Sequence, residues 1–256
     1  MSINNVSLDI DFVRAQFPAF KDPLSAKWSF FENAGGSYVP INVIERLNHF
    51  MTSTKVQPYA EFDTSAIAGD NMDQATSLFS EMINAENDEI IIGGSTTINM
   101  YVLSNAMRGL LNPGDEVIVC CRTWISPAHA PLVLGAKSVL VDCLPKRPVI
   151  DCQQIENRIT EKTKAVIAVH INGRSVDMAV LNQIAKKHHL FVIEDGCQSF
   201  LSQNLEGFLG TQSSAGCFSL GVTKLISTGQ GGVVVTRNQQ FYEEDLQRCL
   251  TSTLHL

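Results

Sequence analysis

From residue 85 onward, short apolar segments alternate with longer amphipathic ones, and this alternation most constrains the fold. The apolar segments are rich in Val and Ile, as strands are when helices cover both faces of a parallel sheet. The segments between them, such as 95–111 and 177–189, place apolar residues at helical spacing. We therefore predict an α/β fold of three α/β/α layers around a mainly parallel, mixed seven-stranded sheet. The expected strands are 88–94, 115–121, 137–143, 164–171, 190–195, 215–221 and 231–236.

Bulk properties exclude several classes of function. The net charge of −7 is the opposite of the basic surface of nucleic-acid domains, so no nucleic-acid partner is expected. No apolar run approaches the ~18 residues of a membrane span, and the N-terminus does not resemble a signal peptide. Seven cysteines without a CxxC pair indicate reduced thiols, with no disulfide framework and no metal site. We expect a cytoplasmic protein with no membrane partner.

The residues that follow each expected strand are the first candidates for a site, because parallel sheets bind ligands at the carboxyl ends of their strands. Ser95, Thr96 and Thr97 follow the first strand and open a helix, whose free N–H groups and positive dipole suit a phosphate. The alternative is an ordinary Ser/Thr helix cap. This position predicts either a phosphate cradle or a simple cap.

Three further side chains follow other strands. Trp124 comes after the second strand, where its ring either stacks on a flat ligand or belongs to the core. Asp195 ends the fifth strand, with Gln198 three residues later. A carboxylate there either caps the following turn or pairs with a protonated ring nitrogen.

Lys224 lies between two apolar strands, before a turn that contains Gly229, Gly231 and Gly232. A lysine in a crowded pocket can lose its proton and form Schiff bases, although a lone lysine is more often an exposed loop residue. A phosphate cradle, an aromatic ring, an acid and an amine on one sheet edge are the groups that pyridoxal 5'-phosphate (PLP) needs. The combination predicts PLP as the cofactor, with Lys224 as its Schiff-base lysine.

At these residues the chain resembles the fold-type I PLP enzymes, whose large domain has the predicted sheet. Its second half is similar to the DegT-type sugar aminotransferases in "VIEDGCQSF" and "CFSLGVTKLISTGQGGVVVT". The resemblance implies a homodimer and assigns roles to the candidates. Lys224 forms the internal aldimine, Asp195 pairs with the pyridine nitrogen, Gln198 contacts the phenolic-oxygen side, Ser219, Thr96 and Thr97 hold the phosphate, and Trp124 stacks on the ring.

The first half is also similar to the class V aminotransferases, the cysteine desulfurase and selenocysteine lyase branch. The similarity lies in "FFENAGGSYVPINVIERL" and "DEIIIGGSTTINMYVL", and it places Asn33 and Gly35 near the substrate. That branch usually carries His directly before the lysine, where this chain has Thr223, so the sugar aminotransferases are favoured. His170, at another strand end, either contacts the substrate site or caps the turn.

The resemblance also sets expectations for domains and function. Residues 1–45 are expected to line the active site, and 46–256 to form the PLP-binding large domain. Relatives continue into a smaller C-terminal domain that completes the substrate pocket, and we expect that domain to be absent from this chain. The leading hypothesis is transfer of an amino group from glutamate or glutamine to a keto group of a nucleotide-linked sugar. The alternatives are a class V desulfurase or lyase, and a truncated PLP-fold protein without catalysis.

Overall fold

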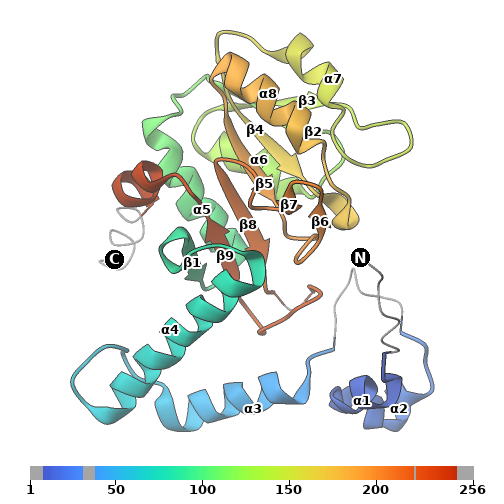
Figure 1. The fold of residues 1–256 in the computed structure, drawn as a ribbon, viewed down its shortest axis with the longest axis vertical. Helices are drawn as coiled ribbons and strands as arrows, with labels where there is room; N and C mark the ends of the chain where they lie inside the picture. Colours follow the sequence, from blue (N-terminus) through green and yellow to red (C-terminus); the bar gives the residue numbers. More distant parts are fainter. Residues whose placement is uncertain (1–7, 31–37, 222, 247–256) are drawn as a thin grey trace.

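The centre of the molecule is a seven-stranded sheet, in the computed structural model that describes residues 8–30, 38–221 and 223–246. The strand order is β1-β9-β8-β5-β4-β2-β3 (Figure 1). β9 runs antiparallel to both of its neighbours, and the other neighbouring pairs are parallel. The mainly parallel, mixed sheet is thus confirmed. The strands are β1 Ile90–Gly93, β2 Glu116–Cys120, β3 Lys137–Val141, β4 Thr163–Val169, β5 Phe191–Asp195, β8 Ala215–Ser219 and β9 Gly232–Val235.

Helices cover both faces of this sheet, because successive strand residues point to opposite sides. Val117 and Val119 of β2 pack with helices α5 (Thr96–Ala106) and α6 (Ile125–Val133) in one core cluster. Ile118 of β2 packs on the other face with α7 (Cys152–Ile155) and α8 (Met178–His188). The predicted three-layer arrangement is confirmed.

Helix α4 (Asp63–Ile83) joins the sheet to the N-terminal part of the chain. Phe79 and Ile83, near its end, pack on β8 and β9 in a third core cluster, on the same face as α8. The rest of α4 and helix α3 (Ile41–His49) extend away from the sheet (Figure 1). Helix α3 ends at His49, and one π-helical turn, Phe50–Thr54, follows it.

The remaining elements are short. Helices α1 (Ile10–Ala15) and α2 (Pro23–Ala26) precede α3, and a two-stranded hairpin of β6 (Gln203–Asn204) and β7 (Gly207–Phe208) precedes β8. Among the residues that the structure describes, no helix is long and apolar enough to span a membrane.

Candidate active site

The register of the sheet brings the candidate strand ends to one edge. Gly232, which begins β9, pairs with both Gly93 of β1 and Ser219 of β8. Farther along the same edge, Asp195 of β5 pairs with Val169 of β4. The residues after β1, β4, β5 and β8 therefore share one side of the molecule, as the sequence predicted for a parallel sheet.

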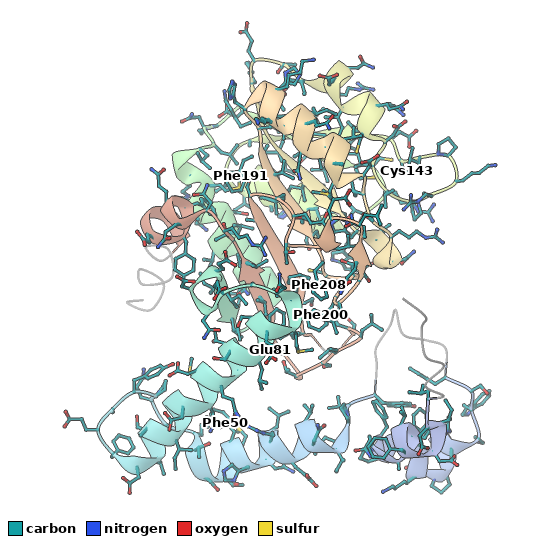
Figure 2. All side chains as sticks on the ribbon, viewed as in Figure 1. Phe50, Glu81, Cys143, Phe191, Phe200 and Phe208 are labelled. Atoms are coloured by element: carbon teal, nitrogen blue, oxygen red, sulfur yellow. The ribbon has the colours of Figure 1, made fainter. Side chains whose placement is uncertain are left out.

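Lys224 lies in the turn that connects β8 to β9. The turn is held by bonds from Leu220 N to Gly231 O at 2.9 Å and from Lys224 N to Gly221 O at 3.0 Å. Beside it is a cavity of about 520 Å³, which is in the size range of small-molecule and cofactor sites. Its lining includes Lys224, Ser219, Gln198, Cys197, Asn172 and Phe200. Phe200 lies with Phe208 at the end of the sheet nearest α4, where Glu81 is labelled (Figure 2).

The Lys224 side chain is half-buried. Within residues 8–30, 38–221 and 223–246, its amine makes no ion pair. A lysine amine without a carboxylate partner, in a walled cavity, can react with a carbonyl group. Lys224 is therefore not the fully exposed loop lysine that the sequence left open as an alternative.

Asp195, at the end of β5, has 9% of its surface exposed. It is not among the residues that line the cavity, although Cys197 and Gln198, shortly after it in the chain, are. Its Oδ1 accepts a hydrogen bond from Cys197 N at 3.0 Å, so the carboxylate caps the turn that follows the strand. The cap uses Oδ1, so a carboxylate oxygen of Asp195 can still pair with a ring nitrogen. The two interpretations of Asp195 therefore do not exclude each other.

Gln198 lines the cavity, and its amide is oriented by the neighbouring loop. The Oε1 atom accepts a hydrogen bond from Asn172 N at 2.8 Å. Because the oxygen is directed to Asn172, the NH₂ group is the end that can donate to a ligand. An amide donor suits the phenolic oxygen that the resemblance assigns to it.

The expected phosphate cradle coincides with the start of α5. Ser95 is the N-cap, and its Oγ accepts a hydrogen bond from Ile98 N at 3.1 Å, so the capping alternative describes its side chain. Thr96 and Thr97 are the first helical residues, and their side chains lie outside the description. The helix N-terminus still presents backbone N–H groups at the sheet edge.

Trp124 and His170 also stand outside the Lys224 cavity. Trp124 precedes α6 and is 72% exposed, so it is not a core residue, and it is not among the residues that line the cavity. His170 is fully buried, and its Nδ1 accepts a hydrogen bond from Val176 N at 3.2 Å. The capping alternative describes His170, because its imidazole faces the turn and the interior.

The predicted N-terminal contacts are not placed. Asn33 and Gly35 lie outside the described residues. None of the described residues between 8 and 45 lines the Lys224 cavity, so the expected lining role of 1–45 stays a prediction. Sequence analysis missed Asn172 and Phe200 as lining residues. In the sequence, the only sign that Asn172 lines the site is its place three residues after the end of a strand. Phe200 is marked only by its closeness to Gln198 in the chain.

The residues present fit PLP. Lysine, amide and serine groups line the cavity, whose volume is adequate for the cofactor, and the Asp195 carboxylate ends a strand at the same sheet edge. In addition, two buried polar atoms of the described chain lack a hydrogen-bond partner: Asn99 Nδ2, in α5, and Thr123 Oγ1, beside Trp124. Buried polar atoms normally have partners, so this edge suits a ligand with polar groups.

Solved structures share this fold. An aminotransferase from Psychrobacter cryohalolentis superimposes with a TM-score of 0.71 at 27% identity, covering 82% of this chain and 50% of the other. NtdA from Bacillus subtilis, solved with the bound cofactor PMP, superimposes with a TM-score of 0.67 at 26% identity, covering 82% and 45%. The fold is that of the PLP-dependent aminotransferases.

The sequence narrows the class to a family. The model of the DegT/DnrJ/EryC1/StrS aminotransferase family matches residues 55–252, and the chain belongs to that family. This assignment confirms the DegT-type resemblance. It favours the sugar aminotransferases over the class V branch, whose resemblance rests partly on residues before 55.

Two curated relatives illustrate the family. GDP-perosamine synthase of Escherichia coli O157:H7 is 33% identical over 67% of this chain and 45% of its own length. L-glutamine:2-deoxy-scyllo-inosose aminotransferase of Streptomyces lividus is 34% identical over 50% of this chain and 30% of its own length. The chain therefore spans less than half the length of these relatives.

Proposed function

We propose that this chain carries the cofactor half of a PLP-dependent aminotransferase that moves an amino group from glutamate or glutamine to a keto group of a nucleotide-linked sugar. The observation that carries the proposal is the Lys224 amine in a cavity shared with Gln198 and Ser219, in a chain of this family. One relative is named for a GDP-linked sugar product, and the other for a glutamine donor, which supports this substrate class.

Each residue has a distinct task in this proposal. PLP, when bound, supplies the electron sink that makes the donor Cα–H acidic. The Lys224 amine binds the cofactor covalently and, once released, takes the proton from Cα and returns it as general base and acid. Asp195 keeps the pyridine nitrogen protonated, Gln198 donates to the phenolic oxygen, and Ser219 with the α5 N-terminus holds the phosphate.

The overall exchange balances without an oxidant. Glutamate gives up its amino group and takes an oxygen from water, so it leaves as 2-oxoglutarate, and the carbonyl oxygen of the sugar leaves as water. The keto carbon of the sugar becomes a carbon that bears an amine and a hydrogen. The net reaction needs no metal ligand from the chain, and the proposal includes none.

We also propose that the protein works as a homodimer. Large apolar side chains are exposed along α3 and α4, where they form an unpaired surface outside the sheet: Ile44, Leu47, Ile67, Met72, Leu78 and Met82. Exposed apolar surface of this extent is typical of an interaction face. A second copy of the chain would cover it.

The first test is the change Lys224→Ala. We expect the wild-type chain to take up PLP with the visible absorbance band of lysine-bound cofactor, and to form 2-oxoglutarate from glutamate with a ketosugar nucleotide present. Lys224→Ala loses the band, resists borohydride trapping of PLP and loses turnover by several orders of magnitude, while cofactor still binds weakly. Lys186→Ala, an exposed lysine of α8, serves as the control and keeps both properties.

The same assay separates the alternatives. Turnover retained by Lys224→Ala would refute the proposal. Release of alanine and sulfide from cysteine would favour a desulfurase instead. Cys197, which lines the cavity, is a poor nucleophile for that chemistry, because its hydrogen bond with Cys217, burial and the Asp195 carboxylate raise the pKa of its thiol well above the usual value. Cofactor binding without turnover of any amine would indicate a non-catalytic PLP-fold protein.

A further inference from the structure

Two consecutive acids end β5, and they face opposite sides of the sheet. Asp195 pairs with Cys217, on the face covered by α5, whereas Glu194 points to the face covered by α8, because successive strand residues alternate. His170 follows β4, the neighbouring parallel strand, on the same side as Glu194. Both Glu194 and His170 are fully buried, and neither has a task in the proposed function.

Glu194 is held by three donors. Its Oε2 accepts from His170 Nε2 at 2.9 Å and from Gly210 N at 2.8 Å, and its Oε1 accepts from Gln212 N at 2.6 Å. A buried carboxylate is tolerated when its oxygens are satisfied in this way. These bonds tie the end of β5 to the loop that follows β7.

The orientation of His170 follows from its second contact. Val176 N donates to Nδ1 at 3.2 Å, so Nδ1 is the acceptor and carries no hydrogen. The hydrogen of the neutral ring is then on Nε2, where it donates to Glu194. One imidazole therefore joins the turn 170–176 to the carboxylate of Glu194.

The turn 170–176 is hydrogen-bonded to Asp195 and to Gln198, two of the residues proposed to contact the cofactor. His170 N donates to Asp195 O at 3.0 Å, which fixes the end of β5 against β4. Asn172, inside the turn, donates to Gln198 Oε1 at 2.8 Å. A shift of the turn would move the Gln198 amide and the backbone of Asp195 together.

We propose that Glu194 and His170 are a positioning pair, which sets the Asp195 carboxylate and the Gln198 amide for the cofactor. The proposal rests on the proposed function for what those two residues bind. It assigns no chemical step to the pair. Its effect is transmitted through the turn 170–176 and the end of β5.

Conservative changes test the pair. Glu194→Gln keeps the shape of the side chain but replaces one carboxylate oxygen by an NH₂ group. That group cannot accept a hydrogen bond, so at least one of the three bonds to Glu194 is lost. His170→Asn keeps an acceptor near Nδ1 and loses the donor to Glu194, whereas His170→Gln can keep a donor near Nε2. The control is Glu156→Gln, because Glu156 pairs with His188 at the same 2.9 Å on the exposed surface.

The measurements are PLP affinity and the visible circular dichroism of bound PLP, which reports how the ring is held. We expect Glu194→Gln and His170→Asn to weaken PLP binding about tenfold and to reduce the dichroism per bound PLP. His170→Gln is expected to recover most of the affinity, and Glu156→Gln to match the wild type. A purely structural pair would lower thermal stability without changing the dichroism, and that result would overturn the proposal.

Amide hydrogen exchange, measured without PLP, tests the positioning role of Glu194 and His170 independently of the proposed function. The amides of Asn172 and Cys197, which donate to Gln198 and Asp195, should exchange at least tenfold faster in Glu194→Gln and His170→Asn. Amides of β2 should be unchanged. Unchanged exchange at Asn172 and Cys197 would refute the positioning role, even if the wild-type chain binds PLP.

Discussion

Neighbouring residues at the end of β5 show how position determines the use of a side chain. Glu194 and Asp195 have the same functional group, yet the Glu194 carboxylate accepts from three donors and Asp195 Oδ1 accepts from the Cys197 amide. The difference arises because a strand turns successive residues to opposite faces. Glu194 is therefore held within the fold, whereas Asp195 is the acid that we propose for the cofactor.

Gly93, where β1 ends, allows a close approach that no other residue permits. A Cβ on Gly93 would overlap Asn99 Oδ1, whereas the nearest atom to a Cβ on Gly94 is 3.8 Å away. We expect Gly93→Ala to displace Asn99, to lower the free energy of unfolding by about 1–3 kcal/mol and to weaken PLP binding. Chemical denaturation and PLP titration measure both effects.

Gly94→Ala is the matched control for this change. It adds the same methyl group one residue later, with room for it, and we expect near wild-type stability and affinity. Equal behaviour of the two variants would contradict the close-approach argument.

At the scale of elements, helix α8 supports the site from behind. It begins directly after the turn 170–176, and Met178, Leu181 and Ile184 bury its inner face against the sheet. Its start is determined by Asp177, whose Oδ1 accepts a hydrogen bond from Val180 N at 3.1 Å. The helical spacing over 177–189 predicted a helix here, and Asp177 is its N-cap.

Asp177→Ala tests the contribution of that cap. We expect a loss of about 1 kcal/mol in the free energy of unfolding, because a free N–H group is left at the start of α8. The denaturation midpoint in urea measures the loss, with Lys186→Ala on the exposed side of the same helix as the control. An unchanged midpoint would show that the cap contributes nothing.

At the scale of the whole molecule, the sheet and its helices bury most of their apolar side chains, whereas α3 and most of α4, which extend away from the sheet (Figure 1), do not. The two helices leave the body of the molecule with apolar residues exposed. A surface of this kind needs a partner to be stable in water. Its extent is the physical reason for the proposed homodimer.

Leu78→Glu, in α4, tests this interface. Leu78 is 54% exposed, and a buried, unpaired carboxylate at a dimer interface is costly. We expect sedimentation to show a dimer for the wild type and at least tenfold weaker association for the variant. Leu132→Glu, at a 52% exposed leucine of α6, is the control and should stay dimeric. A monomeric wild type would contradict the proposal.

Much of the fold follows from local patterns in the sequence. The seven strands, the α8 cap and the turn that carries Lys224 were predictable because hydrophobic periodicity and turn residues act over a few positions. The strand-end rule then grouped Asp195, Ser219 and the α5 start on one edge, and the register of Gly232 with Gly93 and Ser219 agrees with it.

Only the tertiary structure decided how these residues are used. The pair formed by His170 and Glu194 joins positions 24 residues apart, and no local pattern records such a contact. The exposure of Trp124 and the wall formed by Asn172 depend likewise on how loops from different strands pack. By itself the sequence determined the elements and the chemical groups at their ends, because these depend on near neighbours. Burial and hydrogen-bond partners depend on distant segments, so only the folded chain distinguished Glu194, which is enclosed by three donors, from Asp195.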